Sequence, residues 1–248
     1  MPEVFKPNAA QRLGSDYADL DPAVALDLVA ANQILAHHGV LDSFGHVSVR
    51  DPRDPNRYVQ MQAIAPRDVS VGDLITFDLE SNAINAHGRP VYRERFIHGQ
   101  IYKLRPDVNA VVHSHSPTVI PFSVTEKPLR AIFHNGHFLG QGTPVWEIRS
   151  AAAEENNMLV LTNELGRSLA EKLGNGSVVL MRGHGNAVAG PDLKTTVFRA
   201  IYTEVNAKLQ MQAVMLGGPI TFLNQYEQEK RQNVDRPWET WRKQVGAA

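Results

Sequence analysis

The chain has 248 residues, 43% of them hydrophobic, which suits one α/β domain with a single substantial core. Its 25 Lys and Arg residues almost balance 26 Asp and Glu residues, so a net charge of -1 offers no general field for nucleic acid or an acidic membrane surface. The absence of cysteine excludes disulfides and thiolate metal sites, and it fits a reducing compartment.

The N-terminal segment 1–21 has no apolar core of signal-peptide length. No later stretch approaches the roughly 18 uninterrupted apolar residues that span a bilayer. We therefore expect a cytoplasmic protein that binds neither nucleic acid nor membrane.

The first predicted element is a helix near the N-terminus. Asp21 and Pro22 supply an N-cap and a first-turn proline, apolar residues follow at helical spacing, and Gly39 closes the run. After it come short β-rich segments separated by turns rich in Asp, Pro, Asn and Gly, which predict a set of antiparallel strands: 46–50, 58–62 and 74–79.

The rest of the chain alternates helices and strands. Helical spacing predicts three more helices: 94–104, about 163–173 and about 193–215. Two β-branched or apolar runs predict buried strands: 109–113 and 177–181. No repeat, linker or composition shift marks a boundary, so we expect one domain over 1–248, with about 20 N-terminal and about 25 C-terminal residues as peripheral extensions.

The charged C-terminal stretch contains two tryptophans, Trp238 and Trp241. Such large rings usually dock on an apolar surface. The sequence leaves open whether that surface belongs to the core of this chain or to a neighbouring subunit.

The segment His113-Ser114-His115 carries the strongest chemical signal. Residues two apart on an extended chain point to the same side, so the two imidazoles at a strand end can face one metal ion. By itself the motif also fits two polar histidines at the mouth of a loop.

His184 is the third candidate ligand, because it follows the strand 177–181 and has a glycine on each side. Glycines permit unusual backbone angles and close approach of the ring to a ligand, although a surface histidine in a turn fits as well. Three imidazoles that converge with one position left open would suit a catalytic metal.

Glu94 lies four residues before His98, so a helix would place both on one face. The plain alternative for Glu94 is an exposed glutamate favoured by the helix dipole.

Four motifs together resemble the class II aldolase/adducin family, in matching order and similar spacing: Phe44-Gly45-His46-Val47-Ser48, Glu94-x-x-x-His98, His113-x-His115 and Gly183-His184-Gly185. The resemblance covers Pro22 to Leu216. It implies a three-layer α/β/α domain with a mainly antiparallel central sheet, a metal held by His113, His115, His184 and Glu94, and Glu94 as acid/base. It also implies a homo-oligomer, a tetramer or higher, with active sites at subunit contacts.

The substrate class follows from where the chain departs from the sugar-phosphate members. Their hydroxyl-rich phosphate turns are replaced here by segments with arginines, a histidine and aromatic rings: Phe44-Gly45-His46, Ala65-Pro66-Arg67 and Tyr92-Arg93. Arginine matches a carboxylate and an aromatic ring offers a face to another ring. We therefore expect a small aromatic acid as substrate, with the following binding residues: His46, Arg67, Tyr92, Arg93 and Ser116. Surface solvation or a subunit salt bridge is the alternative role for each arginine.

The segments Arg93 to Gly99 and Val111 to Pro117 are similar to a decarboxylase branch of this family, which acts on hydroxylated aromatic or pyridine dicarboxylates. The resemblance implies a carbon–carbon lyase in which one divalent metal ion per subunit stabilises an enolate-like intermediate. Zn²⁺ or Mn²⁺ is expected, and Fe²⁺ or Co²⁺ fits the same ligands.

Two other functions stay open at this point. A metal-dependent aldolase or retro-aldolase acting on an unphosphorylated hydroxy-acid would use the same ion and Glu94. An adducin-like, non-enzymatic interaction module would not need the complete set of metal ligands, which this chain keeps. The loop with His134 and His137 is a further candidate, because the family resemblance allows it to reach a neighbouring subunit's site.

Overall fold

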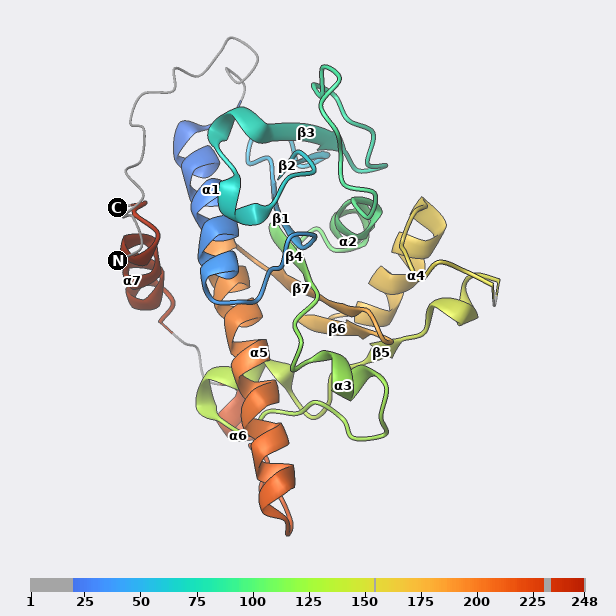
Figure 1. Cartoon of the computed structure of the whole chain (residues 1–248), viewed down its shortest axis with the longest axis vertical. Coiled ribbons are helices and arrows are strands. Elements are labelled where there is room, and N and C mark those ends of the chain that lie inside the picture. Colours follow the sequence, from blue (N-terminus) through green and yellow to red (C-terminus); the bar gives the residue numbers. More distant parts are fainter. Residues whose placement is uncertain (1–19, 154, 230–232, 248) are drawn as a thin grey trace.

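The computed structural model describes residues 20–153, 155–229 and 233–247. A seven-stranded sheet with the order β3-β2-β1-β4-β7-β6-β5 runs through the molecule (Figure 1). Its strands are β1 (His46–Arg50), β2 (Arg57–Met61), β3 (Leu74–Asp78), β4 (Ala110–Ser114), β5 (Val145–Trp146), β6 (Val178–Met181) and β7 (Gly185–Gly190).

The helices are α1 (Pro22–His37), α2 (Phe96–Leu104), α3 (Ile120–Ser123), α4 (Asn163–Leu173), α5 (Leu193–Leu216), α6 (Gln225–Gln228) and α7 (Asp235–Gln244). Short 3-10 turns complete the described elements: η2 (Pro66–Asp68), η3 (Val71–Asp73), η4 (His134–Leu139) and η5 (Ile148–Ser150). Among the described residues, no helix has the length and apolarity needed to cross a membrane.

The first helix forms for the reasons that its sequence suggests. The Asp21 side chain accepts a hydrogen bond from Ala23 N at 2.8 Å, and Pro22 occupies the first turn, where its missing N–H costs nothing. Gly39 adopts a positive φ of 69° beyond the C-terminus. The prediction of this helix is confirmed.

The sheet is mixed, which corrects the expectation of a mainly antiparallel sheet in one respect. All neighbouring strands are antiparallel except β5, which pairs in parallel with β6 through Val145 opposite Leu180 and Trp146 opposite Met181. The physical reason is the connection, because α4 lies between β5 and β6 in the chain and carries it back across the sheet. A strand of two residues gives too little pattern to be predicted from sequence.

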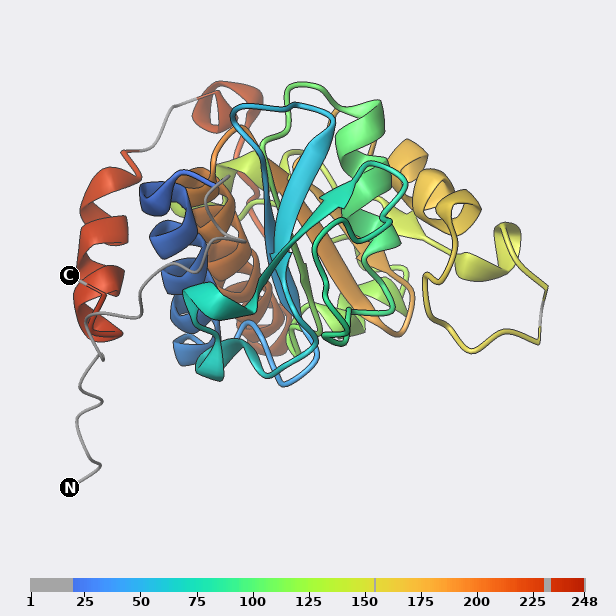
Figure 2. The same ribbon diagram turned by 90° about the horizontal axis from the view of Figure 1, so that it is seen from above.

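Helices cover both faces of the sheet, so its strands are buried on both sides (Figure 2). On β4, Ala110 and Val112 join the hydrophobic cluster beneath α1 and α5, whereas Val111 joins the cluster beneath α2 and α4. This alternation follows from the two-residue period of a strand. It explains why Ala110, Val111 and Val112 of β4 are all apolar, although their side chains alternate between the two faces.

The two C-terminal tryptophans pack on this chain's own core. Trp238 is 0% exposed and Trp241 is 7% exposed, and both belong to the cluster that includes α1 and α5. The Trp241 ring lies 5.4 Å from the His38 ring at the end of α1. The choice that the sequence left open is therefore settled in favour of the chain's own core.

The sequence did not predict β7, because Val188 is the single β-branched residue among the six residues Gly185 to Gly190. Its small residues have a packing reason. A Cβ added to Gly185 would collide with the carbonyl oxygen of Ser114 on β4, so β4 and β7 approach each other closely only because residue 185 is glycine.

We predict that Gly185→Ala lowers the melting temperature, because separating β4 from β7 costs about 1–3 kcal/mol. Gly72→Ala is the control, since its Cβ would meet only Ser70 Oγ at an ordinary 3.6 Å and should change stability by less than about 0.5 kcal/mol. Thermal unfolding followed by circular dichroism measures both. Equal melting temperatures for Gly185→Ala and the wild type would contradict the close approach.

Candidate metal centre and adjoining cavity

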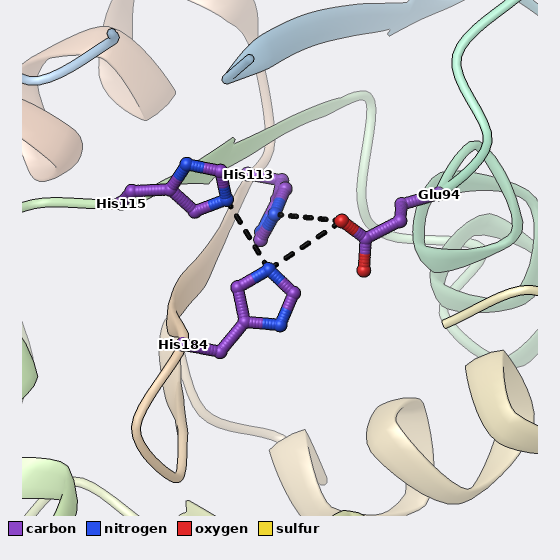
Figure 3. A group of neighbouring side chains, drawn as sticks. All are labelled: Glu94, His113, His115 and His184. Atoms are coloured by element: carbon purple, nitrogen blue, oxygen red, sulfur yellow. Dashed lines mark hydrogen bonds and ion pairs between the residues drawn. The ribbon is translucent and has the colours of Figure 1, made fainter. Parts of the chain in front are cut away.

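Four side chains converge at the end of β4, and their candidate ligand atoms all lie within 4.8 Å of one another (Figure 3). His113 belongs to β4 and His115 follows it. His184 comes from the turn between β6 and β7, and Glu94 comes from the segment just before α2. The convergence predicted from the histidine motifs is therefore present in the fold.

Strand pairing brings these residues together. His113 lies opposite Ala187 of β7, and β6 returns into β7 with Met181 paired to Gly185. The three residues between them form the turn that carries His184, and Gly183 adopts a φ of 64° there. This is the glycine-dependent geometry expected from the sequence. Glu94 precedes α2 instead of lying within it, since the helix begins at Phe96 and not at residue 94 as predicted.

Each histidine of the cluster uses Nδ1 to reach an oxygen acceptor. The pairs are His113 with Asn186 O (3.2 Å), His115 with Asp42 Oδ2 (2.9 Å) and His184 with Met158 O (2.9 Å). Because these oxygens only accept, each Nδ1 carries the proton and donates it. In the neutral form of each ring, Nε2 therefore presents a lone pair, and the three Nε2 atoms face the same small volume.

This arrangement of nitrogens fits a divalent cation. His184 Nε2 and His115 Nε2 are 3.2 Å apart, a separation at which two lone pairs repel unless a proton or a cation lies between them. His113 Nε2 is buried and has no hydrogen-bond partner among the described residues. Three imidazoles with one carboxylate are ligands that zinc, manganese, iron and cobalt all accept.

Glu94 completes the cluster with an ionised carboxylate. Its Oε1 accepts a hydrogen bond from Val160 N at 2.9 Å, and its Oε2 lies 3.4 Å from His184 Nε2 and 3.8 Å from His113 Nε2. Burial acts to raise the pKa of Glu94, but the hydrogen bond with His184, the nearby imidazoles and the Val160 amide outweigh it and bring the pKa to about 2.

The imidazoles differ in their surroundings. Complete burial holds the pKa of His113 well below its ordinary value, so this ring is neutral and free to donate its lone pair. Burial also acts to lower the pKa of His184, but its hydrogen bond and charge interaction with Glu94 outweigh burial and raise it. Of His113 and His184, His184 is therefore the ring that takes up a second proton more readily. A cation bound at Nε2 would take the place of that proton.

A cavity of about 520 Å³ adjoins the cluster and has mainly apolar walls. Glu94, His115 and His184 line it together with the following residues: Ser43, Phe44, His46, Ala63, Ile64, Ala65, Val91, Tyr92, Arg93 and Leu159. The volume lies in the range of small-molecule sites, so a ring-sized acid fits beside the cluster.

The predicted substrate-binding residues fall into two groups. His46, Tyr92 and Arg93 line the cavity, and the Tyr92 hydroxyl donates to the carbonyl of Ile64. Arg67 is exposed on η2 and Ser116 is buried, and neither lines the cavity.

The loop histidines do not join this site within the described chain. His134 and His137 lie on η4, and neither belongs to the cluster or lines the cavity. Their expected contact with a neighbouring subunit stays a prediction.

Asp42 is a site residue that the sequence did not reveal. Its Oδ1 accepts from the backbone N–H groups of Phe44 and Gly45, at 2.8 and 2.9 Å, while its Oδ2 holds His115. The first two contacts are readable as an Asx turn of the type that Asp-x-x-Gly sequences form. The third joins residues 73 positions apart, so no local pattern predicts it.

We predict that Asp42→Ala weakens metal binding by about 10–100-fold, because His115 loses the acceptor that fixes its tautomer and orientation. Isothermal titration with Zn²⁺ or Mn²⁺ measures the change. Asp54→Ala removes an exposed carboxylate paired with Arg57, away from the cluster, and should leave the affinity unchanged. Equal affinities for the two variants would show that Asp42 does not support the site.

Comparison with known proteins confirms the family. The model of the Class II Aldolase and Adducin N-terminal domain matches residues 26–211. Decarboxylase tropJ from Talaromyces stipitatus is 34% identical over 244 residues, with 88% of this chain and 92% of the relative covered. A 3,4-dihydroxyphthalate decarboxylase from Arthrobacter keyseri is 29% identical over 218 residues, covering 84% and 86%.

A solved structure shares the fold. L-fuculose 1-phosphate aldolase from Glaciozyma antarctica PI12 superposes with a TM-score of 0.75 at 21% identity, over 96% of this chain and 95% of that one. The chain therefore belongs to the class II aldolase and adducin family, and it has the α/β fold of that family.

Proposed function

We propose that the protein is a divalent-metal-dependent lyase that decarboxylates a hydroxylated aromatic or heteroaromatic carboxylate, such as a dihydroxyphthalate-like diacid. The observation that carries the proposal is the convergence of three imidazole Nε2 atoms and the Glu94 carboxylate beside a mainly apolar cavity. The similarity to proteins named as decarboxylases supports the same reaction class.

The cluster residues divide the chemical work. A divalent cation held by His113, His115 and His184 would act as a Lewis acid toward the negative charge that remains when carbon dioxide leaves. Glu94 is ionised before substrate arrives, so it takes the proton of a substrate hydroxyl. After the carbon–carbon bond breaks, Glu94 returns that proton to the ring carbon. The product oxygen regains a proton from water, so the net reaction takes up one proton.

The cavity walls supply recognition. Val91, Ile64 and Leu159 offer apolar contact to a planar ring, and Tyr92 adds an aromatic face. We propose Arg93 as the arginine that binds a substrate carboxylate, because it lines the cavity and Arg67 does not. Ser116 is buried and does not line the cavity, and its Oγ is 3.2 Å from Ser114 Oγ, so we propose that it acts on the substrate only through its neighbours.

We predict that Glu94→Gln lowers turnover by at least about 100-fold while metal stays bound, because the amide cannot carry the proton and the three imidazoles remain. Carbon dioxide release from hydroxylated phthalates and pyridine dicarboxylates measures turnover, and plasma mass spectrometry measures metal content. Glu80→Gln, at the exposed Lys103 ion pair, is the matched control and should keep full activity. Normal turnover in Glu94→Gln would remove its acid/base role.

We predict that Arg93→Ala raises the KM for diacids about tenfold or more and changes kcat less, because a carboxylate partner is lost in substrate binding. Arg67→Ala is the comparison, because Arg67 does not line the cavity and its loss should leave both constants near wild type. An unchanged KM in Arg93→Ala, or an equal rise in Arg67→Ala, would contradict the assignment.

A metal-dependent aldolase or retro-aldolase acting on an unphosphorylated hydroxy-acid is the second candidate, because the same cluster would serve it. The mainly apolar walls favour an aromatic ring over a hydroxyl-rich chain. Release of carbon dioxide from aromatic diacids, compared with release of aldehyde from hydroxy-acids, separates the two reactions.

We further propose a cytoplasmic homo-oligomer, with chain 1–248 as one three-layer α/β/α domain with peripheral ends. The two hydrophobic clusters on opposite sides of one sheet support the layered description. Met215 and Leu216 at the end of α5 are 82% and 88% exposed, which supports contact with another copy.

A further inference from the structure

A buried chain of hydrogen bonds lies behind the cavity, between β1 and α2. It runs from Tyr102 Oη to Ser48 Oγ (2.7 Å), from Ser48 Oγ to His98 Nδ1 (2.6 Å) and from His98 Nε2 to His46 Nδ1 (2.7 Å). The four side chains are at most 1% exposed, so water does not compete for these bonds. Only His46 also lines the cavity.

The groups at the two ends fix the direction in which this chain donates. At the far end, Ser48 Oγ is the hydrogen-bond partner of the Tyr102 hydroxyl among the described residues, so the phenol proton donates to Ser48. Ser48 then donates to His98 Nδ1, and His98 keeps its own proton on Nε2.

At the near end, His46 Nδ1 receives two donors. His98 Nε2 lies 2.7 Å away and the side-chain nitrogen of Gln60 lies 3.0 Å away. A ring nitrogen that accepts from its neighbours carries a lone pair and no proton, so the single proton of neutral His46 is on Nε2.

Within the described part of the chain, the side-chain hydrogen bonds of His46 all use Nδ1 and none uses Nε2, while the residue is 1% exposed and lines the cavity. The ring is held from two sides, with the Tyr92 ring centroid at 4.5 Å and the His113 ring centroid at 5.2 Å. The site therefore contains an oriented N–H donor that opens on the cavity and lacks an acceptor.

We infer that His46 Nε2–H is a fixed donor to a substrate oxygen, the carboxylate of an aromatic diacid that is not bound at the metal cluster. His98 is the positioning residue that holds His46 in the donating tautomer. This inference rests on the proposed function for the identity of the acid and adds the residue pair that selects a second carboxylate. The donor is preorganised, because its rotamer and tautomer are set before substrate enters.

The hydrogen bonds from Tyr102 to His46 hold a proton on His46 Nε2 and do not deliver one to the substrate. A proton moved from His46 into the substrate would have to be replaced from Tyr102, and burial raises the pKa of that phenol. Tyr102 is 1% exposed, and its hydroxyl has Ser48 Oγ as its hydrogen-bond partner among the described residues, so no hydrogen bond among them brings a replacement proton to it. Proton return to carbon therefore stays with Glu94, and His46 contributes binding.

The experiment compares phthalate with benzoate, which lacks the second carboxylate, by isothermal titration into the metal-loaded protein. In the wild type, phthalate should bind more tightly than benzoate. His98→Leu should lower phthalate affinity about tenfold and benzoate affinity by less than twofold, because only the donor for the second carboxylate is released. His98→Gln keeps an N–H near the same place and should restore most of the phthalate affinity.

Tyr102→Phe tests the Tyr102 end of the hydrogen-bond chain and removes only one hydroxyl group. It should weaken phthalate binding two- to threefold, whereas Tyr58→Phe should have no effect. Tyr58 is the matched control, because it is equally buried in the same hydrophobic cluster and its hydroxyl bonds Ser81 and Arg95 instead. Tyr102→Phe decides the question if His98→Leu does not fold, as judged by circular dichroism.

Loss of phthalate selectivity in His98→Leu with rescue by His98→Gln, or in Tyr102→Phe but not Tyr58→Phe, supports the inference. If His98→Leu and Tyr102→Phe both fold and keep the wild-type preference for phthalate over benzoate, the inference is overturned, even if the enzyme decarboxylates aromatic diacids. Selective phthalate binding by a protein that releases no carbon dioxide from any hydroxylated diacid would instead overturn the proposed reaction and leave the His46 donor standing.

Discussion

The candidate metal site depends on the Nδ1 hydrogen bonds that turn three imidazole lone pairs toward one point. A carboxylate, Asp42, and two backbone carbonyls, from Asn186 and Met158, accept these protons. These hydrogen bonds fix the tautomers, so the lone pairs on the Nε2 atoms of His115 and His184 repel each other at 3.2 Å. The buried His113 Nε2 has no hydrogen-bond partner among the described residues. A divalent cation would accept all three lone pairs, so the arrangement of these rings suits a metal ion.

The sheet provides the precision that this arrangement requires. β4 lies between β1 and β7, so its end presents His113 and His115 with His46 on one side and the β6–β7 turn on the other. Close contact of β4 with β7 depends on Gly185, and the turn depends on the positive φ of Gly183. Small backbone requirements therefore fix the positions of reactive side chains.

Much of this could be predicted from sequence, for physical reasons that differ by element. The α1 boundaries follow from Asp21, Pro22 and Gly39, and His113-x-His115 follows from strand periodicity, because these signals are local. The two-residue strand β5 and the glycine-rich strand β7 carry no such signal, since they are held in the sheet by their neighbours. Contacts between residues far apart in the sequence could not be predicted from local patterns either. Two examples are the contact of Asp42 with His115 and the contact of His98 with His46.

The central claim is that three imidazoles hold one metal ion through their Nε2 atoms. X-ray absorption spectroscopy of the purified, metal-loaded protein tests it most directly. The account predicts about one divalent ion per chain, with three imidazole nitrogens at about 2.0–2.1 Å if the ion is zinc, together with oxygen ligands. A protein that binds no ion, or an ion with fewer than three imidazoles around it, would contradict the account.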